Sequence, residues 1–289
     1  MDDRKKALIS ILVGSILGGA TASVTKIGLI DFPPFSFVFV RFLIASLVLL
    51  PFVNLKTIIR NSIHILPVAI FFTINILVFI IGIKLTTATI SQLLYAGVPF
   101  LTSIFLYIFF KEKIGTAKST GVLIGFIGVT SIILLPAIEG KQFSGNLLGN
   151  ALIGIGVISY SLFMVYSRNA LKKYSPFVIT ATITFITAII AFPLFIYENI
   201  NTSYWWNDLA PASISALLYI AIVSTILTYL LNQYAIKHGG SVFASTSLYL
   251  VPLFNYLTAY ILLGEKLTEG LIIGGILILV GIYLAGVKK

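Results

Sequence analysis

Apolar blocks, each about 20 residues long, recur along the whole sequence. We count ten, at about 7–29, 34–53, 64–84, 87–110, 116–137, 147–167, 176–197, 210–236, 241–263 and 269–287. A helix of roughly 20 residues crosses about 30 Å of hydrocarbon, and continuous apolar runs do not show the alternation of a transmembrane barrel. The sequence therefore predicts an all-α integral membrane protein with ten transmembrane helices.

Charged residues are few and unevenly distributed among the connectors. Only 10% of the residues are charged, against about 25% in typical soluble domains. With a cytoplasmic N-terminus, fourteen Lys and Arg residues fall on the inner side and four on the outer side. This bias predicts a multi-pass protein of the cell membrane with both termini cytoplasmic. The net charge of +10 is then a topology signal, and we expect the bilayer, not nucleic acid, as partner.

The second half of the sequence repeats the first. Residues 99–113 read PFLTSIFLYIFFKEK, and residues 252–266 read PLFNYLTAYILLGEK, at a shift of 153. The two copies, 7–137 and 147–287, hold five expected spans each, and five crossings end on the opposite side from where they began. The second copy is therefore expected to be inverted relative to the first. Secondary transporters share this construction and place their substrate near the bilayer midplane.

The segments that carry the repeat also carry a family resemblance. They are Arg41 early in span two, residues 88–99 and Glu112-Lys113 around span four, and residues 234–237 and 252–266 in the second half. In their order and doubled occurrence they resemble the EamA-type transporters of the drug/metabolite transporter superfamily, over residues 7–287. The resemblance implies export or facilitated movement of amino acids, related metabolites or drugs.

Two basic residues are candidate contacts for an anionic substrate group. Arg41 lies about seven residues into span two, roughly 10 Å from its outer end, where a charge is costly and by default functional. Its planar guanidinium suits a carboxylate, and Lys26, near the outer end of span one, is a second cation. The alternative is that Lys26 extends its amine to the interface and that Arg41 pairs with Asp31 or with backbone carbonyls.

Further polar and aromatic side chains lie deep in the expected spans and are candidate lining residues of a midplane cavity. A metabolite must exchange its hydration for a few such groups. The alternative is hydrogen bonding between helices, which explains many polar groups in membrane spans. The candidates are Asn75, Gln92, Tyr95, Tyr160, Asn232, Thr246 and Tyr249.

Prolines and small residues recur at related places in the two copies. Pro99 and Pro252 stand at matched positions in spans four and nine, where proline kinks a helix and is a candidate hinge. Small residues follow each other at a spacing of four in spans five and ten, which favours close helix packing. These two spans either pack together within one chain, which we expect, or form the seam of a homodimer. The residues are Gly121, Gly125, Gly270 and Gly274.

The sequence offers few groups for catalysis or metal binding. It has no cysteine, two histidines and nine carboxylates, and the carboxylates fall in tails, loops or span ends, where Glu112 and Glu265 are expected to anchor helices. No Ser-His-Asp arrangement or H-E-x-x-H motif is visible. We therefore expect a non-enzymatic transporter of a small molecule, without cofactor or metal, working by facilitated diffusion or exchange. The alternatives are a membrane-embedded enzyme acting on a lipid or peptide, and a non-transporting receptor or scaffold.

Overall fold

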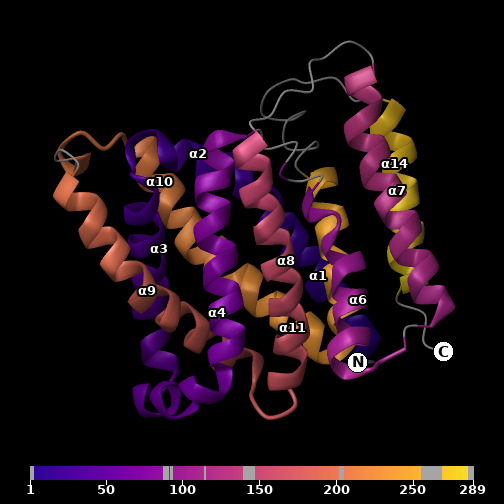
Figure 1. Cartoon of the computed structure of the whole chain (residues 1–289), viewed down its shortest axis with the longest axis horizontal. Coiled ribbons are helices and arrows are strands. Elements are labelled where there is room, and N and C mark those ends of the chain that lie inside the picture. The colour runs from indigo at the N-terminus through magenta and orange to yellow at the C-terminus, as the bar shows by residue number, and fades with distance from the viewer. Residues whose placement is uncertain are drawn as a thin grey trace.

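The computed structural model describes residues 3–86, 91, 94–113, 115–138, 147–201, 205–254 and 269–285. Within these ranges every regular element is helical (Figure 1). The first half contains α1 (Asp3–Gly19), α2 (Thr21–Asp31), α3 (Pro34–Leu49), η1 (Leu50–Phe52), α4 (Leu55–Leu85), α6 (Val98–Phe110) and α7 (Thr116–Ile138). The second half contains α8 (Leu147–Ala170), α9 (Pro176–Asn201), η2 (Trp205–Asn207), α10 (Pro211–Tyr219), the π-helical segment η3 (Ile220–Thr228), α11 (Tyr229–Gly239), α12 (Ser241–Ser245) and α14 (Glu269–Ala285).

Six helical stretches in the described part of the chain are long and apolar enough to cross a membrane. They coincide with six of the expected spans, and the all-helical membrane fold is thereby supported. The count of ten stays a prediction. Of the other four expected spans, 116–137 forms the helix α7, of which the structure describes only the earlier side chains, and 87–110, 241–263 and 269–287 are described only in part. The six stretches are Asp3–Asp31, Pro34–Phe52, Leu55–Leu85, Leu147–Ala170, Pro176–Ile200 and Pro211–Gly239.

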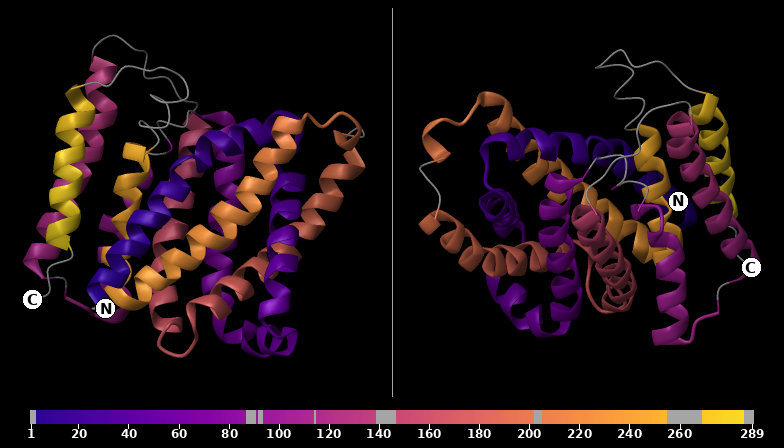
Figure 2. Two further views of the ribbon diagram at one scale, coloured as in Figure 1. Left: turned by 180° about the vertical axis from the view of Figure 1, so that it is seen from behind. Right: turned by 45° about the horizontal axis from the view of Figure 1, so that its top comes forward.

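Helices from the two halves of the chain pack against each other. The α4 helix packs against α8 and α9, α3 packs against α9, and α1 packs against α11. Four phenylalanine rings of their shared core are completely buried, those of Phe37, Phe42, Phe72 and Phe163. The pair α7 and α14 lies at one end of the longest axis, and α9 lies at the other (Figures 1 and 2). The two halves of the sequence therefore share one bundle.

Two of the long spans are interrupted in their middle. The first span breaks at Ala20, between α1 and α2, directly after a glycine pair whose helix propensity is low. The span Pro211–Gly239 widens into η3 between α10 and α11. There the hydroxyls of Thr225 and Thr228 donate to carbonyls five residues earlier, at 2.8 and 3.1 Å. Such π-helical turns are rare and are frequent at functional sites.

The two candidate hinge prolines have different surroundings. Pro99 is the second residue of α6, directly after a turn at Ala96 and Gly97. At that position no helical N–H is required, so the ring is tolerated without a kink. Pro252 lies within the helical residues 247–254. A hinge role for either proline stays a prediction.

Glycines allow α7 and α14 to touch along their backbones. A Cβ atom built on Gly281 would lie 2.6 Å from the Gly125 nitrogen and 2.7 Å from the Gly121 carbonyl oxygen. One built on Gly128 would lie 2.8 Å from the carbonyl oxygen of Gly274. The small residues of the expected spans five and ten therefore pack together within one chain. A homodimer stays a prediction.

A carboxylate from α9 covers the first turn of α3. Glu198 accepts hydrogen bonds from the backbone N–H groups of Phe35, at 3.2 Å, and Ser36, at 2.7 Å, and from the Ser36 hydroxyl at 2.8 Å. The first N–H groups of a helix have no partner within the helix, and a negative charge is favourable there. Glu198 therefore fixes the start of α3, the helix that carries Arg41.

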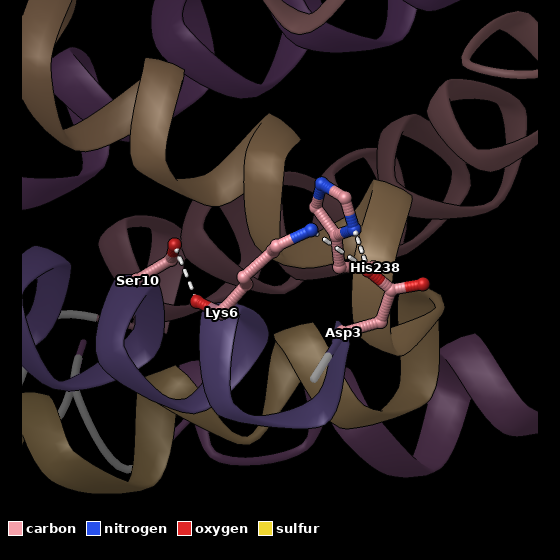
Figure 3. Close-up of polar contacts among 4 residues, drawn as sticks. All are labelled: Asp3, Lys6, Ser10 and His238. Atoms are coloured by element: carbon pink, nitrogen blue, oxygen red, sulfur yellow. Dashed lines mark hydrogen bonds and ion pairs between the residues drawn. The ribbon is translucent and has the colours of Figure 1, made fainter. Parts of the chain in front are cut away.

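The start of α1 is tied to the end of α11 through Asp3 (Figure 3). Its Oδ1 atom accepts a hydrogen bond from the Lys6 amine at 3.1 Å and lies 3.0 Å from Nδ1 of His238. The first turn of α1 and the last turn of α14 lie at the same end of the bundle (Figures 1 and 2). We call this the inner end, following the charge bias of the sequence.

Candidate functional site

A cavity of about 160 Å³ lies where helices of both halves meet. Its walls come from α1, α2, α3 and α4 of the first half and from α8, η3, α11 and α12 of the second. Apolar side chains such as Ile76, Phe79 and Leu248 line it together with polar groups. An apolar cavity of about 150 Å³ holds benzene, so the space fits a metabolite with a handful of heavy atoms.

Arg41 brings a buried positive charge to this cavity. Its side chain is only 3% exposed, and its Nε atom donates to the Thr225 hydroxyl at 2.6 Å. Tyr229 lies near enough to interact with it electrostatically. None of the carboxylates in the described ranges forms an ion pair with Arg41. Asp31 instead accepts a bond from the backbone N–H of Ala210 at 3.0 Å, so the suggested pairing of Asp31 with Arg41 is wrong.

The π-helical segment supplies the acceptor for Arg41. The Thr225 hydroxyl donates its own proton to the Ile220 carbonyl at 2.8 Å, which leaves its lone pairs for the Arg41 Nε–H. A buried charge is costly unless hydrogen bonds compensate it. The widened turn of η3 thus holds the guanidinium at the cavity with a neutral partner and keeps its positive charge available to a ligand.

A second polar cluster joins α4 to α8 on the cavity wall. The Asn75 amide donates to the Tyr95 hydroxyl and, at 2.9 Å, to the Gly156 carbonyl. The rings of Tyr95 and Tyr160 meet edge to face with centroids 6.0 Å apart. A Cβ atom on Gly156 would lie 3.0 Å from the Tyr95 hydroxyl oxygen, so the lack of a side chain at Gly156 leaves room for this close approach. The cluster presents two aromatic faces and an amide to the cavity.

Asn232 adds an unused hydrogen-bond acceptor. It lines the cavity, and its Oδ1 atom is buried without a hydrogen-bond partner among the described residues. Buried polar atoms in native proteins are nearly always hydrogen-bonded. Arg41 thus brings a positive charge to the cavity wall, and Asn232, which also lines the cavity, has an acceptor atom that is buried and unpartnered among the described residues.

The structure brings five of the nine residues predicted as substrate contacts to this cavity. These are Arg41, Asn75, Tyr95, Tyr160 and Asn232, and Pro252 lines it as well. Gln92 lies outside the described residues. For every one of these residues, contact with a substrate stays a prediction.

Three of the predicted contacts do not line the cavity. Lys26 is an exposed residue, and its amine donates to the Thr86 carbonyl at 3.0 Å. The Thr246 hydroxyl donates to the Phe243 carbonyl at 2.6 Å. The Tyr249 hydroxyl donates to the Val122 carbonyl at 2.8 Å. Of the three, only Tyr249 makes the hydrogen bond between helices that was the alternative interpretation. Thr246 bonds within its own local segment, and the Lys26 amine binds a backbone carbonyl.

The sequence interpretation missed the polar residues of one apolar span. Ser224, Thr228 and Tyr229 line the cavity, and Thr225 binds Arg41. Their signal was a group of hydroxyls at helical spacing between apolar residues. Each hydroxyl is individually common in membrane helices, so the group does not stand out without its partner from α3.

The chain is similar to known transporter proteins. The model of the EamA-like transporter family matches residues 5–134 and again residues 147–287. An uncharacterized transporter of Archaeoglobus fulgidus is 27% identical and covers 91% of each chain. The uncharacterized transporter YdfC of Bacillus subtilis is 27% identical, over 99% of this chain and 93% of its own. A WAT1-related protein of Arabidopsis thaliana is 25% identical, over 71% of this chain and 60% of its own.

The fold also has a counterpart among solved structures. A crystal structure of a protein superposes with a TM-score of 0.76 and covers 97% of this chain and 96% of its own. The two sequences are 17% identical. At that identity the likeness concerns the fold alone.

Proposed function

The chain belongs to the EamA-like transporter family, and from this premise we propose that it is a secondary transporter of amino acids or related small metabolites. It acts as an exporter or facilitator in the cell membrane, with both termini cytoplasmic. Its ten spans form two inverted five-helix repeats, 7–137 and 147–287. The matches of the family model to residues 5–134 and 147–287 support this division.

The observation that carries the substrate class is the pairing of Arg41 and Asn232 in one cavity. An amino acid has a carboxylate, which a guanidinium binds with two parallel hydrogen bonds. Its ammonium group donates hydrogen bonds, which the unpartnered Asn232 Oδ1 accepts. Tyr95 and Tyr160 offer apolar faces for a small side chain. A zwitterion thus complements the Arg41 charge, which has no carboxylate partner among the described residues, and the unpartnered acceptor of Asn232.

The cavity walls come from both halves of the chain, and this supports alternating access. Because both halves contribute lining residues, a rocking motion of one repeat on the other exposes the same cavity to each side in turn. No protonatable carboxylate of the described residues lines this cavity. Proton-driven carriers keep such a group in their pathway, so the proposed mode is facilitated diffusion or exchange.

The proposal is tested with purified protein in liposomes loaded with a defined mixture of amino acids, whose efflux is measured by mass spectrometry. We expect at least one zwitterionic amino acid to leave faster than from protein-free liposomes. Arg41→Gln is expected to abolish this efflux, because a neutral amide does not attract the carboxylate. Arg60→Gln is the matched control, since Arg60 is an exposed arginine on α4 outside the cavity.

Two outcomes contradict the proposal. One is normal efflux through folded Arg41→Gln protein, which removes the assigned role of Arg41. The other is efflux of none of the amino acids by wild-type protein, which removes the substrate class. Uphill accumulation driven by an imposed pH gradient alone contradicts the uncoupled mode.

A further inference from the structure

A second hollow, of about 560 Å³, lies at the inner end of the bundle. It is formed where α6, α8 and α11 end and where α7 and α12 begin. Its floor is apolar and consists of Leu106, Leu171, Ile236 and Val242. Its lining shares no residue with the cavity at Arg41. It is therefore a separate site.

The rim of this hollow is strongly basic. Five basic residues and one acidic residue line it, namely Lys113, Lys118, Arg168, Lys172, Lys237 and Glu112. Arg168 forms an ion pair with Glu112. The four lysines make no ion pair with any carboxylate of the described ranges. They come from three separate segments of the chain, and the one carboxylate of the lining, Glu112, is already paired with Arg168.

A buried hydroxyl in the same hollow lacks a partner. Ser241 lines the hollow and is only 1% exposed, and its Oγ atom has no hydrogen-bond partner in the part of the chain that the structure describes. It follows Gly240, whose positive φ of 82° favours glycine. A Cβ atom at Gly240 would meet only Arg168 Nε, at 4.0 Å. The space beside Gly240, next to the Arg168 side chain, is therefore not filled.

The first turn of α7 faces the hollow as well. Gly115, Ala117 and Lys118 belong to its lining, and α7 is 23 residues long. The first N–H groups of a helix have no partner within it and attract anions. Together with the lysines and the Ser241 hydroxyl, these donors approach one space from several directions.

We infer that this hollow binds a phosphate-bearing anion, held by the lysines around its rim and by the Ser241 hydroxyl. A tetrahedral phosphate offers acceptor oxygens on all sides, which suits separate ammonium groups, whereas a carboxylate offers them in one plane. Two sources supply this chemistry at the inner end: the headgroup of an anionic phospholipid, which basic pockets between membrane helices bind, and free phosphate. The inference goes beyond transport and does not depend on it.

The test titrates purified full-length protein in neutral detergent with inorganic phosphate, with phosphatidylglycerol or with phosphatidylcholine, at constant ionic strength. The thermal unfolding temperature is the readout, because a ligand that binds only the folded state raises it in a saturable way. We expect phosphate, phosphatidylglycerol or both to stabilise the protein. Stabilisation by phosphatidylglycerol alone identifies the lipid as the source, and stabilisation by phosphate identifies the free anion.

Variants locate the binding. The double variant Lys172→Gln and Lys237→Gln removes two exposed lysines, and this removal leaves the helix packing intact. The ligand concentration that gives half-maximal stabilisation is expected to rise roughly 30-fold. In Ser241→Ala the ligand concentration for half-maximal stabilisation is expected to rise about tenfold, since a hydrogen bond to a charged group is lost. The matched control is the double variant Lys56→Gln and Arg60→Gln, which removes two exposed basic residues of α4 outside the hollow.

Four outcomes overturn the inference. Three of them are the absence of saturable stabilisation by phosphate and phosphatidylglycerol, a wild-type response of the Lys172 and Lys237 double variant, and an equal loss in the α4 control. Stabilisation by phosphatidylcholine as strong as that by phosphatidylglycerol overturns it too, because the net negative charge then has no effect. None of these outcomes bears on the efflux of amino acids through the cavity at Arg41.

Discussion

Arg41 Nε donates a 2.6 Å hydrogen bond to the hydroxyl of Thr225, 184 residues away in the sequence. The bond joins α3 of the first half to the π-helical segment η3 of the second. Both residues are buried, and the cavity lies beside them. Any motion that separates the two halves at this point has to break this bond or carry both residues together, so it couples the candidate substrate site to the packing of the halves.

Replacement of Thr225 by valine tests this bond. The substitution keeps the shape of the side chain and removes the acceptor, so the Arg41 Nε–H is left buried and unpaired. We expect a loss of about 1.5–3 kcal/mol of stability, the typical value of a hydrogen bond to a charged group, and a marked loss of efflux. Thermal unfolding in detergent and the liposome assay measure the two effects.

Thr228→Val is the control for Thr225→Val. Thr228 also donates to a carbonyl five residues earlier, but it does not bind Arg41. Its substitution is expected to cost about 1 kcal/mol, as for a neutral hydrogen bond. Equal losses in the two variants would contradict a special role for the Arg41 contact.

Tyr95→Phe removes the hydroxyl that receives the Asn75 amide proton and keeps the aromatic ring. Asn75 retains its bond to the Gly156 carbonyl, so we expect only about 0.5–1.5 kcal/mol of destabilisation. Because one N–H of this cavity-lining amide then lacks its partner, the half-saturating substrate concentration is expected to change more than the maximal rate. Tyr107→Phe, at an exposed position of α6, should alter neither quantity, and a similar effect there would refute the assignment.

Much of the fold was visible in the sequence, because hydropathy reports burial in lipid. Six of the expected spans are long apolar helices in the structure, and the glycines of the expected spans five and ten lie at a contact between α7 and α14. Arg41 stood out since a charge within an apolar run is costly. These features depend on local composition and spacing, which a sequence contains directly.

The partners of the site residues were not visible. Whether Tyr249 faces a cavity or the Val122 carbonyl depends on the rotation of its helix, which contacts between helices determine. Hydropathy also contains no information about which carbonyl each backbone N–H binds, so the sequence of η3 does not differ from that of an ordinary apolar α-helix. Thr225 becomes an acceptor for Arg41 only when the two halves of the chain pack together.

Glu198→Gln tests the charge at the start of α3. The amide oxygen can still accept one hydrogen bond, but the negative charge that favours the helix N-terminus is lost. We expect about 1–2 kcal/mol of destabilisation, near the upper range of helix-capping effects, measured by thermal unfolding. Asp208→Asn is the control, because Asp208 is exposed beyond η2. The assignment fails if both variants unfold at the wild-type temperature.

Two glycine substitutions should change the stability of the protein in opposite directions. Gly281→Ala places a Cβ atom within 2.6–2.8 Å of backbone atoms of Gly121 and Gly125, which cannot move aside as a flexible side chain can. Overpacking of this kind typically costs about 1–3 kcal/mol, so the variant should unfold at a lower temperature. Gly154→Ala in α8 meets no atom within 4 Å, and it should gain up to about 1 kcal/mol from the higher helix propensity of alanine. Thermal unfolding of both variants decides the matter: a Gly281→Ala protein as stable as wild type would show that α7 and α14 do not touch along their backbones.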